Sequence, residues 1–385
     1  MTDALVIGGG LAGGALATRL ASAGRAVILV EREAGPVDKV CGEFLSREAA
    51  LYLGSLGIDL GSLGAVAIDT LRFCEGAHLA EVKLPFTAQS LSRRVLDEAL
   101  LERAAAAGAD IRRGTKVHAL TRAGSGSGSA SGSGWTARTD AGTLEAGATF
   151  LATGKHDLRG FKRPPGSQDD LVAFKMYWSL APGQRAQLER HIELVLFDGG
   201  YAGLSLIEND VANLCLLVRR SRLQVLGDHE TRWENLLAAM CVESPHLDAR
   251  LDGATALLSK PLALSAIPYG HVRRDSDGLW RLGDQAAVIP SFSGDGMSIA
   301  LHSAELAAST FLSGGDASAF QKALARDVTT QMRLATTLSQ GLVRRKTQLA
   351  FGAAARLFPG LMASVAFHTR VSDAALSRVR PTPAT

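Results

Sequence analysis

The sequence of 385 residues has few cysteines, few aromatic residues and no long apolar run. Its four cysteines contain no Cys-x-x-Cys pair, which argues against a disulfide framework and against a structural zinc site, so we expect no metal. No window reaches about 18 uninterrupted apolar residues, and no basic segment precedes the first strand-like run. We therefore expect neither a membrane-spanning helix nor a signal peptide, and predict a cytoplasmic protein.

Hydrophobic residues nevertheless make up 46% of the chain, and its mean hydropathy is +0.11, as in a globular protein with a large core. Basic residues are concentrated near the C-terminus. From Gln321 to Thr385, ten Lys and Arg accompany only Asp327 and Asp373, so this region carries +8 and the remainder −5. A basic face with interleaved Leu and Phe fits peripheral contact with an anionic membrane, but a solvated helix face is the simpler interpretation. Proteins that bind single-stranded nucleic acid stack its bases on aromatic side chains, and no basic segment here contains such residues. We therefore expect no nucleic-acid partner.

A cluster of glycines separates the first strand-like run from the first helical run. Residues 4–7 read as a buried strand, 11–23 as a helix and 26–30 as a second buried strand. The intervening Gly8, Gly10 and Gly13 have the Gly-x-Gly-x-x-Gly spacing that allows a tight turn, close approach of a pyrophosphate and close helix packing. Glu31 ends the second strand, where a carboxylate can accept hydrogen bonds from ribose hydroxyls. This context predicts a dinucleotide site.

Further along the chain, the pattern predicts a second, inserted domain. Residues 94–107 read as a helix, and the Gly/Ser-rich segment 124–134 reads as the tip of a long hairpin. From Leu171 to Arg220, strand-like runs follow one another without intervening helices, which favours an antiparallel sheet. A helix is expected over 296–313, and everything beyond Ser318 reads as helix, broken at Pro359.

Three stretches, "DKVCGEFLS" from Asp38, "LSRRVLDEALLERAAAAGA" from Leu91 and "RLGDQAAVIPSFSGDGMSIALHSAELAA" from Arg281, carry a family resemblance. The sequence resembles the FAD-dependent oxidoreductases that include aromatic hydroxylases, geranylgeranyl reductases and flavin halogenases, with the p-hydroxybenzoate hydroxylase-like fold. The resemblance implies an α/β protein with a Rossmann-like FAD-binding domain, an inserted antiparallel β-sheet substrate domain and a helical C-terminal tail. We place the FAD-binding domain at 1–75, 91–165 and 265–317, the substrate domain at 76–90 and 166–264, and the helical region at 318–385.

The resemblance also implies roles for individual residues. Asp284 would accept hydrogen bonds from the ribityl chain, Arg93 would lie near the cofactor unless it is a surface residue, and backbone at Val117 would pair with adenine. The helix after Gly294 would direct its positive dipole end at the flavin. The full predicted cofactor-binding set is Gly8, Gly10, Leu11, Ala12, Gly13, Glu31, Arg32, Lys39, Cys41, Gly42, Arg93, Val117, Gly154, Gly283, Asp284, Pro290, Gly294, Gly296, Met297 and Ser298.

No residue stands out as a catalytic group, and the weak candidates are Cys41, Glu43 and His156. Cys41 has no Cys-x-x-Cys partner, which favours packing beside the flavin over redox chemistry. Glu43 is a candidate acid, and an ordinary loop salt bridge is an equal alternative. His156 is the one titratable candidate near the cofactor, and a surface histidine is the simpler interpretation.

The sequence motifs indicate the type of reaction less specifically than they indicate the cofactor. The Trp-x-Trp-x-Ile-Pro motif of the halogenases has no match, because Trp178 is followed by "SLAPG". The sequence resembles geranylgeranyl reductases at "KVCGE" and at residues 199–216. In the second stretch, however, Gly203 replaces their Trp, and Ser205-Leu206 replaces their Phe-Pro. The hydroxylase pattern at "ATGKHDLRG" keeps Gly154 and departs at Thr153, Asp157 and Arg159.

We therefore predict an FAD-dependent monooxygenase of an apolar aromatic or polyketide-like molecule of secondary metabolism. The alternatives are a flavin-dependent C=C reductase like the geranylgeranyl reductases, and a flavin-binding protein without turnover. Since no second Gly-x-Gly-x-x-Gly occurs, NAD(P)H would dock transiently as electron donor, or a partner protein would deliver the electrons.

Overall fold

The computed structural model describes residues 2–122, 134–228 and 231–379. The predicted Gly/Ser hairpin tip lies almost entirely outside these residues. The parallel sheet predicted at the N-terminus is present, with five strands in the order β17-β10-β1-β2-β6. Its strands are β1 (Ala4–Ile7), β2 (Val27–Val30), β6 (Asp110–Arg112), β10 (Ala148–Leu151) and β17 (Trp280–Arg281).

Both faces of this parallel sheet are covered, which explains why β1 is apolar at every position. Ala4 and Val6 face helices α1 (Leu11–Ser22), α3 (Arg93–Ala106) and α8 (Gly296–Leu312). Leu5 and Ile7 pack instead with a three-stranded sheet on the opposite face. That sheet consists of β7 (Val117–Arg122), β8 (Trp135–Thr139) and β9 (Gly142–Ala146).

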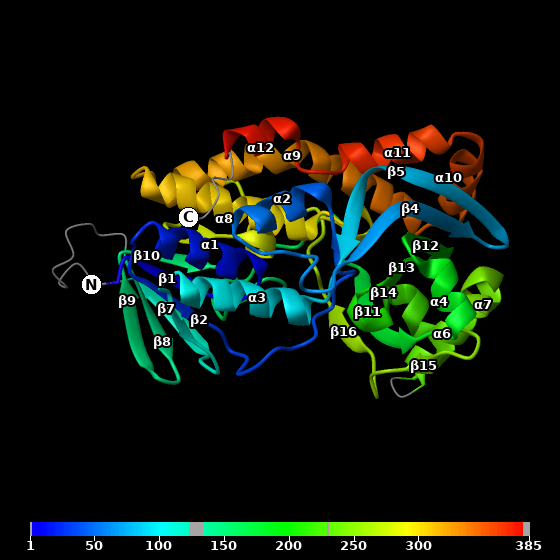
Figure 1. Ribbon diagram of the computed structural model, residues 1–385, viewed down its shortest axis with the longest axis horizontal. Helices are drawn as coiled ribbons and strands as arrows, with labels where there is room; N and C mark the ends of the chain where they lie inside the picture. The colour runs from blue at the N-terminus through cyan, green and yellow to red at the C-terminus, as the bar shows by residue number, and fades with distance from the viewer. Residues whose placement is uncertain (1, 123–133, 229–230, 380–385) are drawn as a thin grey trace.

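A larger sheet forms the other half of the molecule (Figure 1). Its strand order is β15-β11-β14-β13-β12-β4-β5-β3, and β16 also pairs with β11. The strands are β3 (Phe44–Leu45), β4 (Val66–Glu75), β5 (His78–Ser90), β11 (Leu171–Ser179), β12 (His191–Phe197), β13 (Gly200–Leu206), β14 (Ala212–Arg219), β15 (Thr255–Ala256) and β16 (Leu262–Ser265).

Three details of this large sheet differ from the sequence-based expectation. Helix α4 (Pro182–Leu188) interrupts the strands between β11 and β12, where no helix was predicted. The sheet is antiparallel except at β12 and β4, which pair in parallel, because β4 is contributed by a distant part of the chain. The domain boundary placed after Glu75 cuts the β4–β5 hairpin, although the two strands pair along most of their length. The division into domains otherwise stays a prediction.

Helices cover this sheet and bridge the two halves. One face of the sheet packs on α4, α6 (Arg232–Glu243) and α7 (Pro245–Leu251), and the short α5 (Arg220–Gln224) follows β14. Helix α2 (Arg47–Ser55) packs on α8 and β5. The C-terminal region is helical as predicted, with breaks at 343–344 and 369–372 besides the one at Pro359. It forms α9 (Ala317–Leu342), α10 (Arg345–Leu357), α11 (Pro359–His368) and α12 (Asp373–Arg378).

The C-terminal helices do not present the single apolar stripe that their spacing suggests. Leu342 and Phe351 point into the core, whereas Leu349, Leu357 and Phe358 are 49%, 72% and 62% exposed. Helices α10 and α11 lie against β4 and β5 at one end of the molecule (Figure 1). Within the described residues, no single helix is long and apolar enough to cross a membrane. The segments 345–357 and 362–378 have the length and composition of a membrane span only when they are taken together, and the chain bends by 108° between them.

A buried charge cluster holds the large sheet to α7. Glu193 on β12 is fully buried, and its Oε1 lies 2.5 Å from Arg72 Nη1, 2.8 Å from Arg250 Nη2 and 2.9 Å from His246 Nε2. Burial alone would raise the pKa of Glu193, but the adjacent His246 and Arg250 lower it to about 2. The ionised carboxylate is therefore the form that the folded protein stabilises.

We expect Glu193→Gln to lower the free energy of unfolding by about 3 kcal/mol at pH 7, because it leaves buried Arg250 without its counter-ion and Arg72 with Glu81 alone. Since the folded pKa lies below the unfolded one, the difference from wild type should be full above about pH 5 and shrink as the pH falls towards 2. Urea denaturation across this range measures it, with exposed Glu189→Gln as control. An unchanged stability of Glu193→Gln would show that the cluster is not stabilising.

Candidate functional site

The glycine segment between β1 and α1 borders a cavity of about 800 Å³, named here the nucleotide cavity. Gly8 has a φ of +108°, and a Cβ there would lie 2.5 Å from the carbonyl oxygen of Ala152. A Cβ at Gly13 would lie 1.8 Å from the carbonyl oxygen of Gly8, so glycine is required for α1 to pack this closely on β1. A Cβ at Gly10 would meet no atom nearer than 3.2 Å, and Gly10 itself lines the cavity. Each of the three positions thus requires glycine for a different reason: backbone conformation at Gly8, helix packing at Gly13 and space for a ligand at Gly10.

Glu31 follows β2, and its carboxylate lies beside the glycine segment. Its Oε2 accepts a hydrogen bond of 2.6 Å from the N–H of Gly9, and its Oε1 accepts one of 3.0 Å from the N–H of Glu33. Because each carboxylate oxygen has two lone pairs, capacity remains for ribose hydroxyls. Glu31 therefore also fixes the glycine segment, a contact that the sequence pattern did not predict.

The start of α1 offers an anion site. Its N-cap, Gly10, has no side chain to satisfy the first N–H groups of the helix, which therefore remain available to phosphate oxygens. Two cations lie close by: Lys39 Nζ is 2.6 Å from Asp97 Oδ2, and Arg93 Nε is 2.8 Å from Asp97 Oδ1. Two positive charges against one carboxylate leave a positive balance, which suits a pyrophosphate. The side chain of Arg93 is only 15% exposed, so it is not an ordinary surface residue.

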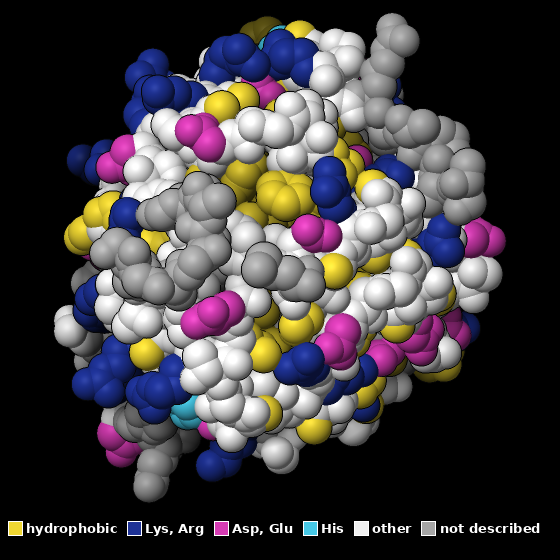
Figure 2. All heavy atoms as spheres, turned by 90° about the vertical axis from the view of Figure 1, so that its left-hand side faces the viewer, with side chains coloured by type: hydrophobic (Ala, Val, Ile, Leu, Met, Phe, Trp, Pro, Cys, Tyr) yellow, Lys and Arg dark blue, Asp and Glu magenta, His cyan; other side chains and the backbone are white. Residues whose placement is uncertain are grey.

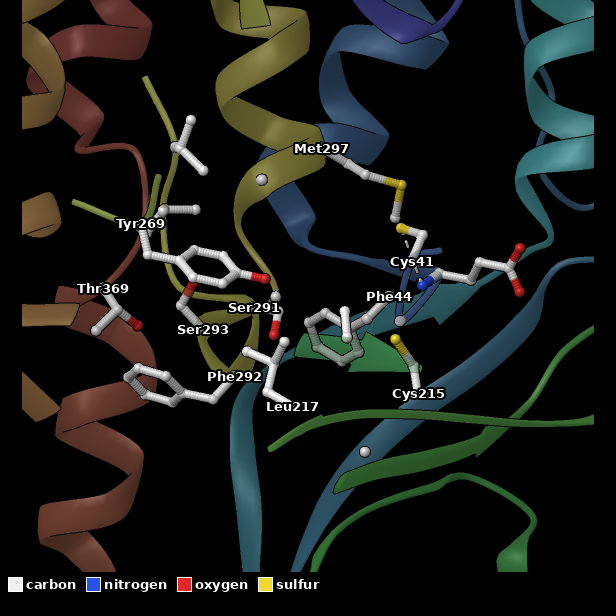
Figure 3. Close-up of a pocket in the computed structure, with 18 of the residues that line it drawn as sticks. Cys41, Phe44, Cys215, Leu217, Tyr269, Ser291, Phe292, Ser293, Met297 and Thr369 are labelled. Atoms are coloured by element: carbon white, nitrogen blue, oxygen red, sulfur yellow. Dashed lines mark hydrogen bonds between the residues drawn. The ribbon is translucent and has the colours of Figure 1, made fainter. Parts of the chain in front are cut away.

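A second cavity, of about 380 Å³, extends inward from the first and is named the inner cavity. Figure 3 shows aromatic, hydroxyl and sulfur-bearing side chains around it, contributed by both halves of the molecule. The N-terminus of α8 points into it: Gly296 and Met297 line the wall, and N-cap Asp295 makes no side-chain capping bond. The residues common to both cavities are Gly10, Val40, Arg93, Ala152, Gly154, Lys155 and Asp284.

These features fit FAD. The nucleotide cavity has the glycine cradle, the uncapped helix and the acid that an ADP moiety requires, and the inner cavity has a second uncapped helix N-terminus where a flavin edge would lie. The residues shared by the two cavities mark the passage for the ribityl chain, with Asp284 among them.

The predicted cofactor-binding residues gather at these two cavities. Of the 20 positions, 17 line one cavity or both, Arg32 and Val117 among them. Gly13 does not, because it serves the packing of α1. Ser298 is turned away from the cavities, and its Oγ lies 2.6 Å from Ser46 Oγ. Pro290 precedes the turn at 291–293, and its carbonyl accepts a hydrogen bond from Ser293 Oγ. Direct cofactor contact by each residue stays a prediction.

The three weak catalytic candidates lie in different surroundings. Cys41 lines the inner cavity, and its sulfur accepts a 3.4 Å hydrogen bond from the N–H of Glu43. His156 lines the nucleotide cavity. Partial burial, followed by nearby Arg32 and Lys155, lowers its pKa, which keeps the imidazole neutral near pH 7.

Glu43 is fully buried in an ion pair with Lys175, whose side chain is equally buried. The distance from Lys175 Nζ to Glu43 Oε1 is 2.6 Å, and this oxygen also accepts hydrogen bonds from Tyr177 Oη and from the N–H of Arg93. Burial raises the pKa of Glu43, opposed by Lys175. The "salt bridge" interpretation of Glu43 therefore describes its observed contacts, although the bridge lies in the core rather than on a loop surface.

Sequence reasoning missed the groups that hold segment 39–43. Lys175 donates to the carbonyl of Lys39 at 3.1 Å, Lys155 to that of Val40 at 3.0 Å, and Asn213 to that of Cys41 at 3.1 Å. One signal was visible: Lys175 is a charge in the middle of the otherwise apolar strand "LVAFKMYWSL" and must find a buried partner.

Comparison with known proteins agrees with this geometry. Residues 1–137 match the family model of the FAD binding domain. A menaquinone reductase from Mycolicibacterium smegmatis is 28% identical over 342 residues, which cover 81% of this chain and 77% of that protein. The protein is an FAD-dependent oxidoreductase. The resemblance to the p-hydroxybenzoate hydroxylase-like superfamily is thereby confirmed, and the alternative of a flavin-binding protein without turnover is not retained.

Solved structures share the fold of this oxidoreductase. The flavin-dependent brominase Bmp2 has a TM-score of 0.75 at 17% identity, covering 96% of this chain and 93% of its own. The halogenase PltM has a TM-score of 0.72 at 18% identity, covering 99% and 87%. PqsL of Pseudomonas aeruginosa, described as a probable FAD-dependent monooxygenase, has a TM-score of 0.70 at 18% identity, covering 91% and 98%. At these identities the likeness concerns the fold alone, and the predicted fold class is confirmed.

We expect Gly10→Val to abolish FAD binding, because a branched side chain at this position would occupy the space of the pyrophosphate. Flavin absorbance of the purified protein, normalised to its concentration, measures this. Gly35→Val is a matched control, since a Cβ at Gly35 meets nothing within 4 Å. Full flavin content in Gly10→Val would contradict the assignment of the nucleotide cavity.

Proposed function

We propose that this oxidoreductase is a monooxygenase that hydroxylates a small aromatic molecule carrying an apolar tail, of the polyketide-like kind found in secondary metabolism. One observation carries the proposal: the inner cavity combines aromatic rings near the α8 N-terminus with largely aliphatic walls elsewhere. Beside the α8 N-terminus it is bordered by the rings of Phe44, Tyr269 and Phe292, as Figure 3 shows. Its other walls, formed by the large sheet and by α9 to α11, are mostly aliphatic, with Leu194 and Val365 among them, and include the rings of Phe73, Tyr201 and Phe351.

The shape at Gly203 supports an aromatic substrate. Gly203 on β13 lines the inner cavity, and a Cβ there would have only the carbonyl oxygen of Cys215 within 4 Å, at 3.8 Å. Since the resembled reductases have Trp at this position, the smaller residue leaves room for a ring beside the flavin. The aliphatic continuation would then receive the tail, at a gain of about 0.8 kcal/mol for each buried methylene.

The protein's own part in such a reaction is to bind, orient and exclude water. When bound, reduced FAD with O₂ supplies the oxidising chemistry. The apolar lining keeps the reacting centre dry. Hydroxyl groups of Tyr269, Ser291 and Thr369 line the same cavity and would orient polar atoms of the substrate. Because the chain has one dinucleotide motif, the electrons would come from NAD(P)H docking transiently at the flavin or from a partner protein.

A second candidate is reduction of a C=C bond in a lipophilic chain. The menaquinone reductase relative favours it, because that likeness extends over most of both chains. The matching segment "KVCGE" adds Cys41 at the wall of the inner cavity. Against it stands the replacement of the reductases' Trp by Gly203. Halogenation is not proposed, since the halogenase motif has no match in the sequence.

Oxygen dependence separates the two candidates. With 4-alkylphenols as trial substrates, we expect NAD(P)H oxidation to be stimulated by substrate, to consume O₂ and to stop without it. A reductase given a prenylated quinone would instead form saturated product under strict anaerobiosis. Mass spectrometry of products under ¹⁸O₂ provides the check, and the FAD-deficient Gly10→Val protein is the negative control. A saturated product without O₂ would replace hydroxylation by reduction.

We also propose that α10 and α11 bring this enzyme to an anionic membrane surface, which fits a cytoplasmic protein with a lipophilic substrate. Their outer sides expose Leu349, Leu357, Phe358 and Phe367. Exposed Arg344, Arg345, Lys346 and Arg356 accompany these side chains. At the opposite end of the molecule, basic and acidic side chains are interspersed (Figure 2). Because the inner cavity is bordered by Phe351 and Met362 of the same helices, a molecule could pass from the lipid into it.

We expect the protein to cosediment with vesicles of phosphatidylcholine and phosphatidylglycerol at low salt and to be released by high salt, at about 1 kcal/mol for each basic residue near the surface. Replacing Leu357 and Phe358 together by Ser should weaken binding at both salt concentrations. Val242→Ser, at an equally exposed position on α6, should not. Absence of binding to the anionic vesicles at low salt would exclude the membrane proposal.

A further inference from the structure

Arg370 lies in the segment between α11 and α12 and is counted among the basic residues of the tail, yet it is not on the surface. Its side chain is 5% exposed, and the residue lines the inner cavity. Its Nε and Nη1 atoms are buried and make no hydrogen bond to any described residue. A buried guanidinium with unsatisfied donors is costly, and such a group normally has a partner.

The side chain is held in place by rings and by one carboxylate. Its Cζ lies 4.3 Å from the ring centroid of Phe86 and 5.4 Å from that of Phe44. Nη1 is 3.8 Å from Asp295 Oδ1, which is beyond hydrogen-bond distance, and Asp295 Oδ1 itself has no hydrogen-bond partner. The guanidinium is therefore positioned by contacts that leave its N–H groups free.

The nearby negative charge compensates Arg370 only in part. Burial raises the pKa of Asp295 to about 7, against the opposing effect of Arg370, so this carboxyl is only partly ionised near neutral pH. Glu48 is the other carboxylate that acts on Arg370, at longer range. An anion inside the cavity would thus gain a charge-assisted hydrogen bond without displacing an existing one.

We propose that Arg370 is a recognition site for an anionic oxygen, a carboxylate or an acidic phenol or enol, on the substrate of this enzyme. The inference deepens the proposed function: it gives the apolar-tailed aromatic an acidic oxygen close to Phe44 and Thr369, at the end of the cavity nearest α8. Arg370 acts by binding and orienting this oxygen, while aliphatic side chains take up the tail. Both requirements together define an amphiphilic organic acid.

Paired probes with the same tail test the proposal. We chose 4-heptylbenzoate and its methyl ester, titrated into the FAD-loaded enzyme and followed through the flavin absorbance spectrum and by calorimetry. Wild type should bind the benzoate about tenfold or more tightly than the ester. Arg370→Gln should lose most of this preference while its affinity for the ester stays within about twofold. Arg370→Lys should retain part of it, and Arg356→Gln, on the exposed side of α10, all of it.

Asp295→Asn keeps the test decisive if Arg370→Gln fails to fold. Removing the competing carboxylate should raise affinity for the benzoate and leave the ester unaffected. The proposal is overturned if wild type binds ester and benzoate equally, or if folded Arg370→Gln keeps the preference. It is also overturned if Arg370→Gln changes the flavin reduction potential but neither probe affinity, because Arg370 would then serve the cofactor. If neither probe binds, the assignment of the inner cavity to a substrate is itself wrong. The O₂ dependence of turnover tests the proposed reaction separately.

Discussion

The buried ion pair between Lys175 and Glu43 determines where the two halves of the molecule meet. Lys175 belongs to the large sheet, and Glu43 lies in the segment that connects β2 of the parallel sheet to β3 of the large sheet. Both side chains are fully buried, so neither charge can be lost without leaving the other unpaired in a medium of low dielectric constant. Glu43 also has a positive φ of 57°, a conformation that the surrounding contacts must hold.

The segment fixed by this pair borders both cavities: Lys39 and Val40 line the nucleotide cavity, and Val40, Cys41 and Gly42 line the inner cavity. Three successive carbonyls, from Lys39 to Cys41, accept hydrogen bonds from side chains that are distant in sequence. A loop whose carbonyls are held at three successive residues does not move into the passage between the cavities. The binding of an elongated cofactor and the exclusion of water from the substrate side thus depend on one set of polar contacts in the core. Gly10 provides space for the cofactor, and the N-terminus of α8 directs its dipole at it.

The sequence sufficed for features that depend on local spacing. The glycine segment and the residue at the end of β2 are close in sequence, and the reasons for Gly8 and Gly13 follow from backbone sterics alone. Long-range contacts were not accessible in this way. The parallel pairing of β12 with β4 joins residues more than 100 positions apart. Arg370 shows the same limit: a basic residue in an amphipathic tail reads as surface, and only packing of α11 against β5 places it inside the cavity.

The central claim is that one cavity beside the flavin takes up an aromatic ring together with its apolar tail. A series of 4-alkylphenols from propyl to nonyl, titrated into the FAD-loaded protein and followed by the flavin absorbance spectrum, tests it most directly. If the tail enters the aliphatic part of the cavity, the dissociation constant should fall roughly fourfold for each added methylene until the cavity is filled, as expected for about 0.8 kcal/mol per buried group. A dissociation constant that does not change with chain length would contradict the account.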